Sequence, residues 1–403
     1  MKVLFILVDA LRSSYVNNED MPFLFNLSQK NLTVKKIVPS PGFCERSEIF
    51  TGLDIYDTGN FSAIGFMPEN SNYKYIKNEI SIAKFFSKLN KEYVRKIFNR
   101  YREHCHILPR PYLIPYESLM NFALTEDGQI KFIEHDDIFQ QLTDSKKTYT
   151  LDGFTSLSAV KPMPKNIVSF AENNIKKKID FIPIYIGEID MYGHKYGNNQ
   201  SNMQPFLRDV DNKLKQLHEI AHNNDYVFSV LGDHGMVPVY KKIDIQHSIK
   251  KLDLKLSRDY EVFYDSTMAR FWFFSEKSKN QIIDCLKKDF YDLGVIITES
   301  NALKYRIPLD IKTKNNLPIY GEVIFCCHPG IIISPDYFNS KNKIINGMHG
   351  YLENNLEFGC GFYTSTFGNE QIEKMRLLDI CKLLCNSLEI ELPNNESWER
   401  KVL

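Results

Sequence analysis

Three short apolar runs constrain the fold of this chain more than any other feature. They are Val3–Val8 (VLFILV), Phe181–Gly187 (FIPIYIG) and Tyr226–Leu231 (YVFSVL), and none of them alternates between apolar and polar residues. A strand without alternation is covered on both faces, as in a mostly parallel sheet with helices on each side. Between the last two runs, Met203–Asn223 has apolar residues at helical spacing. This order predicts a strand–helix–strand crossover in an α/β fold.

The length of 403 residues and the 43% of hydrophobic residues suit one large α/β domain over residues 1–403. Residues 95–165, rich in Tyr, Pro and charge, predict an insertion into that domain. Residues 255–325 predict a small α+β subdomain, because strand-like and helical segments alternate there: Met268–Phe274, Asn280–Tyr291 and Gly294–Thr298. In the N-terminal part of the sequence, we expect a strand at Lys35–Pro39 and helices at Pro22–Ser28 and Cys44–Thr51.

Charge and cysteine usage narrow the class of partner. Lys+Arg and Asp+Glu both number 50, so that no global field attracts the chain to nucleic acid or to a membrane surface. The eight cysteines form no CxxC pair, which favours reduced thiols in a cytoplasmic protein. The N-terminal apolar run ends at Asp9, far short of the roughly 20 apolar residues of a membrane span. We therefore expect a cytoplasmic protein that acts on a small molecule, without nucleic acid or membrane as a partner.

Residues of metal-ligand type follow the predicted strands where each strand ends. In an open α/β sheet, ligands bind beyond the carboxyl ends of the strands. An isolated Asp at such a place is usually a helix cap or a turn residue. Here several strand ends carry such residues together, and glycines stand beside most of them, in DMYGHKYG, GDHGM and GMHGY. The candidates are Asp9, Asp190, His194, Asp233, His234 and His349.

Three carboxylates and three imidazoles suit two borderline-hard divalent cations. Zn²⁺ fits such a ligand set better than Mn²⁺. The neighbouring glycines are compatible with backbone that passes close to a metal ion or a phosphate group.

These motifs resemble the alkaline phosphatase superfamily, and within it the type I phosphodiesterase/nucleotide pyrophosphatase branch. The resemblance rests on VDALR, TGLDIYDTGNF, DMYGHKYG, LGDHGMVPV and MHGY, which occur in the family's order over nearly the whole chain. It implies an alkaline phosphatase-like fold with inserted cap segments. It also implies two metal sites, one held by Asp190, His194 and His349, the other by Asp9, Asp233 and His234. The expected reaction is hydrolysis of a small phosphate mono- or diester, nucleotide and sugar-nucleotide linkages included.

The expected nucleophile is missing. In the family that this chain resembles, the nucleophile stands nine residues before the Thr that corresponds to Thr51, and Gly42 occupies this position. Cys44 is the first candidate to replace it, because the N-terminus of a helix lowers the pKa of a thiol. A metal-bound hydroxide that attacks directly is the second, and Ser40 is the third.

Arg46 follows these residues in the same segment and is a candidate phosphate clamp, since a guanidinium can bind two oxygens at once. It is equally compatible with a helix-surface position beside Glu45 or Glu48. Three other activities of the superfamily stay open: sulfatase, phosphonate hydrolase and phosphotransferase. Gly42 also leaves room for a metal-binding relative without catalysis.

Overall fold

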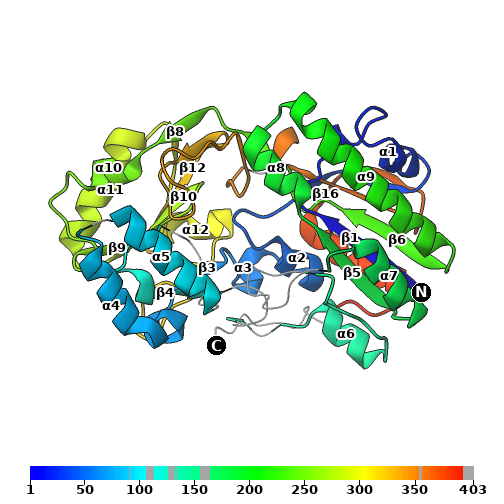
Figure 1. Ribbon diagram of the computed structural model, residues 1–403, viewed down its shortest axis with the longest axis horizontal. Helices are drawn as coiled ribbons and strands as arrows, with labels where there is room; N and C mark the ends of the chain where they lie inside the picture. Colours follow the sequence, from blue (N-terminus) through cyan, green and yellow to red (C-terminus); the bar gives the residue numbers. More distant parts are fainter. Residues whose placement is uncertain are drawn as a thin grey trace. The chain divides into compact units, whose positions relative to one another are not determined.

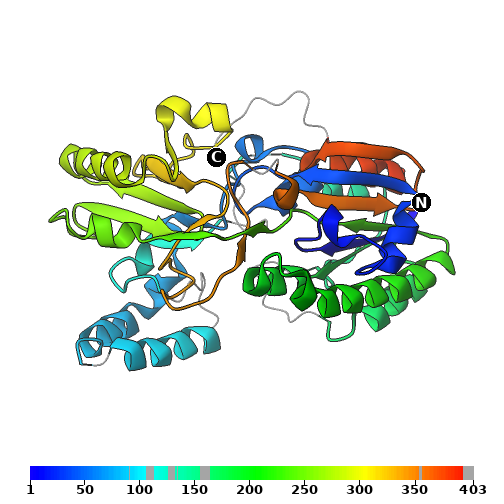
Figure 2. The ribbon, with the colours of Figure 1, turned by 90° about the horizontal axis from the view of Figure 1, so that it is seen from above.

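The computed structural model describes residues 1–89, 91–105, 113–125, 132–133, 135–154, 164–353 and 356–393. Contacts divide the chain into two compact units, which Figures 1 and 2 show. The first unit comprises Met1–Thr58, Ile133–Tyr240 and Ile344–Leu403, and the second comprises Gly59–Phe132 and Lys241–Lys343. The predicted insertion at 95–165 falls partly in each unit, and part of it lies outside the described residues.

A six-stranded sheet forms the first unit, in the order β16-β2-β15-β6-β1-β5. β1 pairs in parallel with both of its neighbours, and β16 pairs in parallel with β2, whereas β15 is antiparallel to both of its neighbours. The predicted mostly parallel α/β sheet is thereby confirmed. The strands are β1 (Lys2–Val8), β2 (Leu32–Val38), β5 (Phe181–Ile186), β6 (Tyr226–Leu231), β15 (Gly361–Ser365) and β16 (Gln371–Arg376).

Both faces of the sheet are buried at β1, β5 and β6, which explains the absence of alternation in these strands. Leu4, Ile6 and Val8 of β1 belong to one hydrophobic core, and the residues between them belong to another. One core includes residues of α1 (Pro22–Ser28), α7 (Ile167–Lys176), α8 (Glu188–Tyr196) and α9 (Gln200–His222). The other includes residues of α2 (Glu45–Thr51), α6 (Ile138–Asp144) and α13 (Ile380–Leu388).

The pairing register of β1 with β5 and β6 brings the carboxyl ends of these three strands together. Val8 lies opposite Ile186, and Leu7 lies opposite Leu231. Residues that directly follow β1, β5 and β6 therefore meet at one edge of the sheet. Two short strands, β7 (Val237–Pro238) and β14 (Gly347–Met348), pair in antiparallel fashion in the same unit.

The second unit contains a four-stranded antiparallel sheet in the order β11-β12-β10-β9. Its strands are β9 (Tyr260–Tyr264), β10 (Met268–Phe273), β11 (Gly294–Thr298) and β12 (Val323–Cys327). The helix between β10 and β11 is α11 (Glu276–Phe290), which begins earlier than predicted because Ser275 caps it by accepting the N–H of Ser278. Further helices of the unit are α4 (Lys77–Phe86), α5 (Lys91–His104), α10 (Ile245–Ile249) and α12 (Glu299–Ala302). Two pairs of short strands complete it: β3 (Ile64–Phe66) with β4 (Phe122–Leu124), and β8 (Lys241–Ile243) with β13 (Ile331–Ile333).

Candidate metal centre

Asp9 and the Asp233–His234 pair meet beyond the ends of β1 and β6. Asp9 accepts a hydrogen bond of 2.5 Å from the hydroxyl of Tyr185, and its Oδ1 lies 3.0 Å from Nε2 of His234. Ala10 adopts a left-handed backbone (φ 61°), and its N–H donates to Oδ1 of Asp233 at 3.3 Å. Ligand atoms of the three acidic and imidazole side chains all lie within 4.8 Å of one another. We call Asp9, Asp233 and His234 the first triad.

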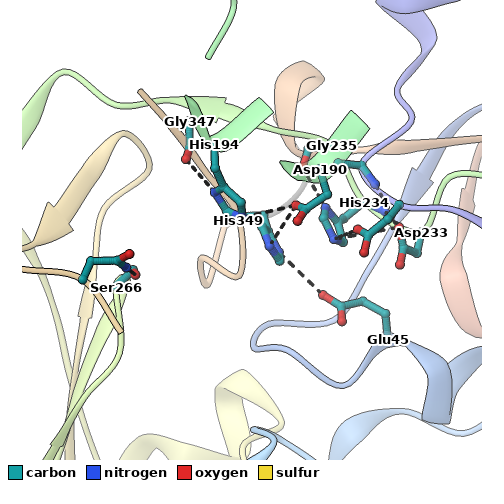
Figure 3. A network of polar contacts seen from close by, with 12 residues as sticks. Glu45, Asp190, His194, Asp233, His234, Gly235, Ser266, Gly347 and His349 are labelled. Carbon is teal, nitrogen blue, oxygen red and sulfur yellow. Dashed lines mark hydrogen bonds and ion pairs between the residues drawn. The ribbon is translucent and has the colours of Figure 1, made fainter. Parts of the chain in front are cut away.

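Asp190, His194 and His349 form the second triad (Figure 3), whose ligand atoms also lie within 4.8 Å of one another. Asp190 and His194 are one turn apart on α8, so that both side chains emerge from the same face. Oδ1 of Asp190 lies 3.2 Å from Nε2 of His194 and 3.5 Å from Nε2 of His349. His349 directly follows β14, whose Gly347 packs against backbone: a Cβ there would lie 2.6 Å from the carbonyl oxygen of Gly193.

Backbone carbonyls fix the orientation of two imidazoles. Nδ1 of His234 donates to the carbonyl of Gly235 at 2.8 Å, and Nδ1 of His194 donates to the carbonyl of Gly347 at 2.9 Å. In a neutral ring the other nitrogen, Nε2, then carries a lone pair, and in both residues it faces a carboxylate oxygen. Two lone pairs at such distances repel each other unless a proton or a cation lies between them. This orientation by a second hydrogen bond is typical of metal-ligating histidines.

Three buried atoms in the two triads strengthen this interpretation. Nδ1 of His349 makes no hydrogen bond with the described residues, and Oδ1 of Asp9 and Oδ1 of Asp190 have only the imidazole Nε2 atoms described above beside them. Buried polar atoms are normally hydrogen-bonded, and unmatched ones call for an unseen partner. The carboxylate and imidazole set fits a pair of divalent cations.

Burial dominates the electrostatics of the protein without metal. It raises the pKa of Asp233 to about 7, and it lowers the pKa of His349 well below its usual value, with His234 and His194 adding to the effect by their charge. At Asp9, burial acts in the raising direction, but the hydrogen bond and charge of His234 outweigh it and lower the pKa. The imidazole of His349 is therefore neutral, which is the form that binds a metal.

Glu45 joins this cluster although no role was predicted for it. Its carboxylate, His234 and His349 also bring ligand atoms within 4.8 Å of one another. Glu45 stands in the first turn of α2, three residues after Gly42. Burial raises the pKa of its carboxyl to about 8. The only signal in the sequence was an acidic residue on the helix that follows the missing nucleophile.

The other candidates of the same segment lie around this cluster. The hydroxyl of Ser40 donates to Oε1 of Glu48 at 2.6 Å, and Cys44 is buried with 3% exposure just before α2. The guanidinium of Arg46 lies 5.2 Å from the centre of the Tyr185 ring, and its charge lowers the pKa of Asp9. Gly42 has φ 98°.

Fold and site together define an α/β protein with two carboxylate–imidazole triads at the carboxyl edge of its sheet. The chain belongs to the type I phosphodiesterase/nucleotide pyrophosphatase family of the alkaline phosphatase superfamily, since the model of that family matches residues 3–352. The resemblance stated from the motifs is thereby confirmed.

Solved structures agree with this fold. Human ectonucleotide pyrophosphatase/phosphodiesterase 5 is 15% identical and superposes with a TM-score of 0.66, over 100% of this chain and 97% of that one. An inactive variant of the murine protein in complex with AMP is 16% identical, with a TM-score of 0.64 over 100% and 97% of the two chains. GTP-dependent dephospho-CoA kinases of Saccharolobus islandicus are 25% identical over 156 residues, which make up 38% of this chain and 76% of each kinase. At that identity the likeness to the kinases defines no family.

Proposed function

We propose that the chain hydrolyses small phosphate mono- or diesters with the help of two divalent cations. The observation that carries this proposal is the pair of triads, in which two histidines turn Nε2 toward carboxylates because Nδ1 is held by a carbonyl. Membership of the phosphodiesterase family supports a phosphate ester as substrate. The AMP complex of the murine structural neighbour supports a nucleotide or sugar-nucleotide linkage.

Asp9, Asp233 and His234 would hold one cation, and Asp190, His194 and His349 the other. Zn²⁺ suits these ligands better than Mn²⁺. When bound, the pair supplies positive charge for the phosphoryl oxygens, the attacking group and the leaving oxygen of an in-line displacement. Arg46, beside Tyr185 and Asp9, is placed to neutralise further negative charge of the substrate.

Water is the attacking group that the described side chains support best. The hydroxyl of Ser40 is engaged by Glu48, and Cys44 is almost fully buried. Neither Cys44 nor Ser40 belongs to a triad, whereas the carboxylate of Glu45 lies close to His234 and His349. Attack by Cys44 remains the alternative, tested below by substitution.

The decisive assay is turnover of chelator-stripped protein reloaded with Zn²⁺ or Mn²⁺. The substrates are p-nitrophenyl phosphate, bis-p-nitrophenyl phosphate and p-nitrophenyl sulfate, with Asp233→Asn as the control. Metal-dependent release from a phosphate, absent in the control, is the expected result and ranks monoester against diester. Release from the sulfate alone would establish a sulfatase instead.

Gly42 supports a second candidate, a metal-binding protein without catalysis, because it provides no side chain for attack. Two bound metals without turnover on any ester, nucleotide esters included, would favour it. The cytoplasmic location stays a prediction.

A further inference from the structure

Glu45 stands between the two triads. Of its two imidazole neighbours, His234 belongs to the first triad and His349 to the second. Its Oε1 lies 4.0 Å from Nδ1 of His349, and its side chain is only 12% exposed (Figure 3). One carboxylate thus faces a ligand from each triad.

The neighbouring nitrogen adds an independent observation. Nδ1 of His349 is buried and makes no hydrogen bond with the described residues, and it points toward Glu45. A purely structural role for Glu45 would be expected to satisfy this nitrogen with a good hydrogen bond, and 4.0 Å is too long for one. Glu45 therefore has oxygen atoms to offer to a cation held by His234 or His349, and carboxylate and imidazole ligands together suit Zn²⁺.

We propose that Glu45 is a seventh metal ligand, whose carboxylate links the two cations. This inference rests on the metal centre of the proposed function. A carboxylate has two oxygens and can serve two cations at once. Glu45 would therefore reach both cations from the first turn of α2, three residues after Gly42.

Metal binding tests the inference without any assay of activity. Chelator-stripped wild type, Glu45→Gln and Glu48→Gln are titrated with Zn²⁺ against a competing chromophoric chelator. Glu48→Gln is the matched control, because it makes the same change one turn later on α2, at a buried residue that contacts Ser40 instead of a triad. Circular dichroism shows whether each variant is folded, and Glu45→Asp serves if Glu45→Gln is not.

The expected result is two Zn²⁺ per wild-type chain and a fall of at least tenfold in the affinity for one or both in Glu45→Gln. Glu48→Gln should stay within about threefold of wild type. Equal affinities of wild type and Glu45→Gln for both ions would overturn the inference and leave the proposed function intact. A wild-type chain that binds no metal would overturn both.

A different observation concerns α4 and α5 of the second unit. These helices and the residues between them carry large apolar side chains that are strongly exposed: Leu89 81%, Phe85 63%, Tyr93 63%, Ile82 57% and Ile97 50%. Several of them line a groove of about 520 Å³ between the helices. A contiguous apolar surface of this kind usually marks a site of interaction.

Exposed basic side chains are frequent in the segment that carries this surface. Among the described residues of the segment 74–104, the exposed cations are Lys74, Lys77, Lys84, Lys88, Lys91, Lys96 and Arg100, and the exposed acids are Glu92 and Glu103. The chain as a whole is neutral, so the segment concentrates positive charge. A second copy of this surface would bring cations against cations. An anionic lipid surface complements both the charge and the apolar side chains.

We also propose that α4 and α5 lie on an anionic membrane surface. This attachment would be peripheral, since no helix among the described residues is long and apolar enough to cross a membrane. It would revise the expectation of no membrane partner, which rested on net charge alone.

Vesicle flotation tests this proposal, with phosphatidylcholine alone and with phosphatidylglycerol added. The variants are Leu89→Ser, Phe85→Ser and, as a control, Tyr291→Ser, which removes an apolar side chain of 76% exposure elsewhere in the second unit. We expect binding only to the anionic vesicles, weakened at least fivefold by the first two variants and unchanged by the control. No binding of wild type to anionic vesicles would refute the proposal. A dimer in solution that Leu89→Ser dissociates would replace the lipid with a second copy.

Discussion

Asp233→Asn should stabilise the metal-free protein while it weakens the binding of metal at the first triad. Oδ1 of Asp233 accepts the N–H of Ala10 at 3.3 Å and the N–H of His234 at 3.0 Å. The amide oxygen of Asn can accept both bonds, so the substitution removes the charge and keeps the local structure. The change therefore isolates the electrostatic cost of a buried carboxylate that has no cation beside it.

The size of this stabilisation follows from the raised pKa of Asp233. Burial raises the pKa of Asp233 from 3.8 to about 7, so that the folded protein keeps this proton where the unfolded chain has lost it. Stability of the metal-free wild type consequently falls as the pH rises from 3.8 to about 7. At about 1.4 kcal/mol per pKa unit, and with part of the effect shared with His234, the loss is about 2–4 kcal/mol. Asn cannot ionise and escapes this loss.

Urea unfolding of the chelator-stripped proteins between pH 5 and pH 8 measures the effect, because the midpoint follows stability when the slope is constant. The advantage of Asp233→Asn should grow with pH and reach its full size near pH 8. Addition of Zn²⁺ should reverse the order, since the wild type can bind metal at both triads and so gains more stability than the variant. A metal-free variant that is less stable than wild type at pH 8, or a difference that does not vary with pH, would refute the reasoning.

Three further predictions concern the surroundings of the triads. Tyr185→Phe removes the hydroxyl that donates to Asp9, and Zn²⁺ affinity measured by competition should fall about tenfold; an unchanged affinity would show that this bond does not orient Asp9. Cys44→Ala should keep turnover within about threefold and cost about 1 kcal/mol in urea unfolding, as for a small buried packing residue; loss of turnover in the folded variant would make Cys44 the nucleophile. Burial raises the pKa of Glu48 from 4.5 to about 7, so its contribution to stability is lost as the pH rises through that interval. Glu48→Gln should remove that pH-dependent loss when urea unfolding is measured over the same pH range. A stability that falls with pH as steeply as in the wild type would contradict this prediction.

The central strands could be predicted from the sequence because burial on both faces leaves a contiguous apolar run. β1, β5 and β6 coincide with the predicted runs to within a residue. The prediction for β2 was less accurate, since the strand covers Leu32–Val38 instead of Lys35–Pro39. Its polar residues interrupt the apolar pattern, and its extent depends on pairing with β15 and β16. β16 is mostly exposed, so that hydrophobicity gave no sign of it.

The site was predictable only where ligands follow such strands. Asp9 and Asp233 stand directly beyond β1 and β6, and register alone brings them together. Glu45 could not be found this way, because its position depends on how α2 packs beside the sheet. The small α+β subdomain predicted at 255–325 lies within the second unit, whereas the inclusion of Gly59–Phe132 in the same unit could not be predicted, because contacts between such distant segments leave no local pattern.

The hydrogen bond from His194 to the carbonyl of Gly347 makes the second triad a cooperative unit. Gly347 belongs to β14, the strand that also carries the backbone into His349. A change that shifts β14 therefore disturbs two ligands at once, and the effects of substitutions in this triad should be far from additive. Over evolutionary time such a triad is kept whole or lost quickly, because the first lost ligand removes most of the benefit of retaining the others.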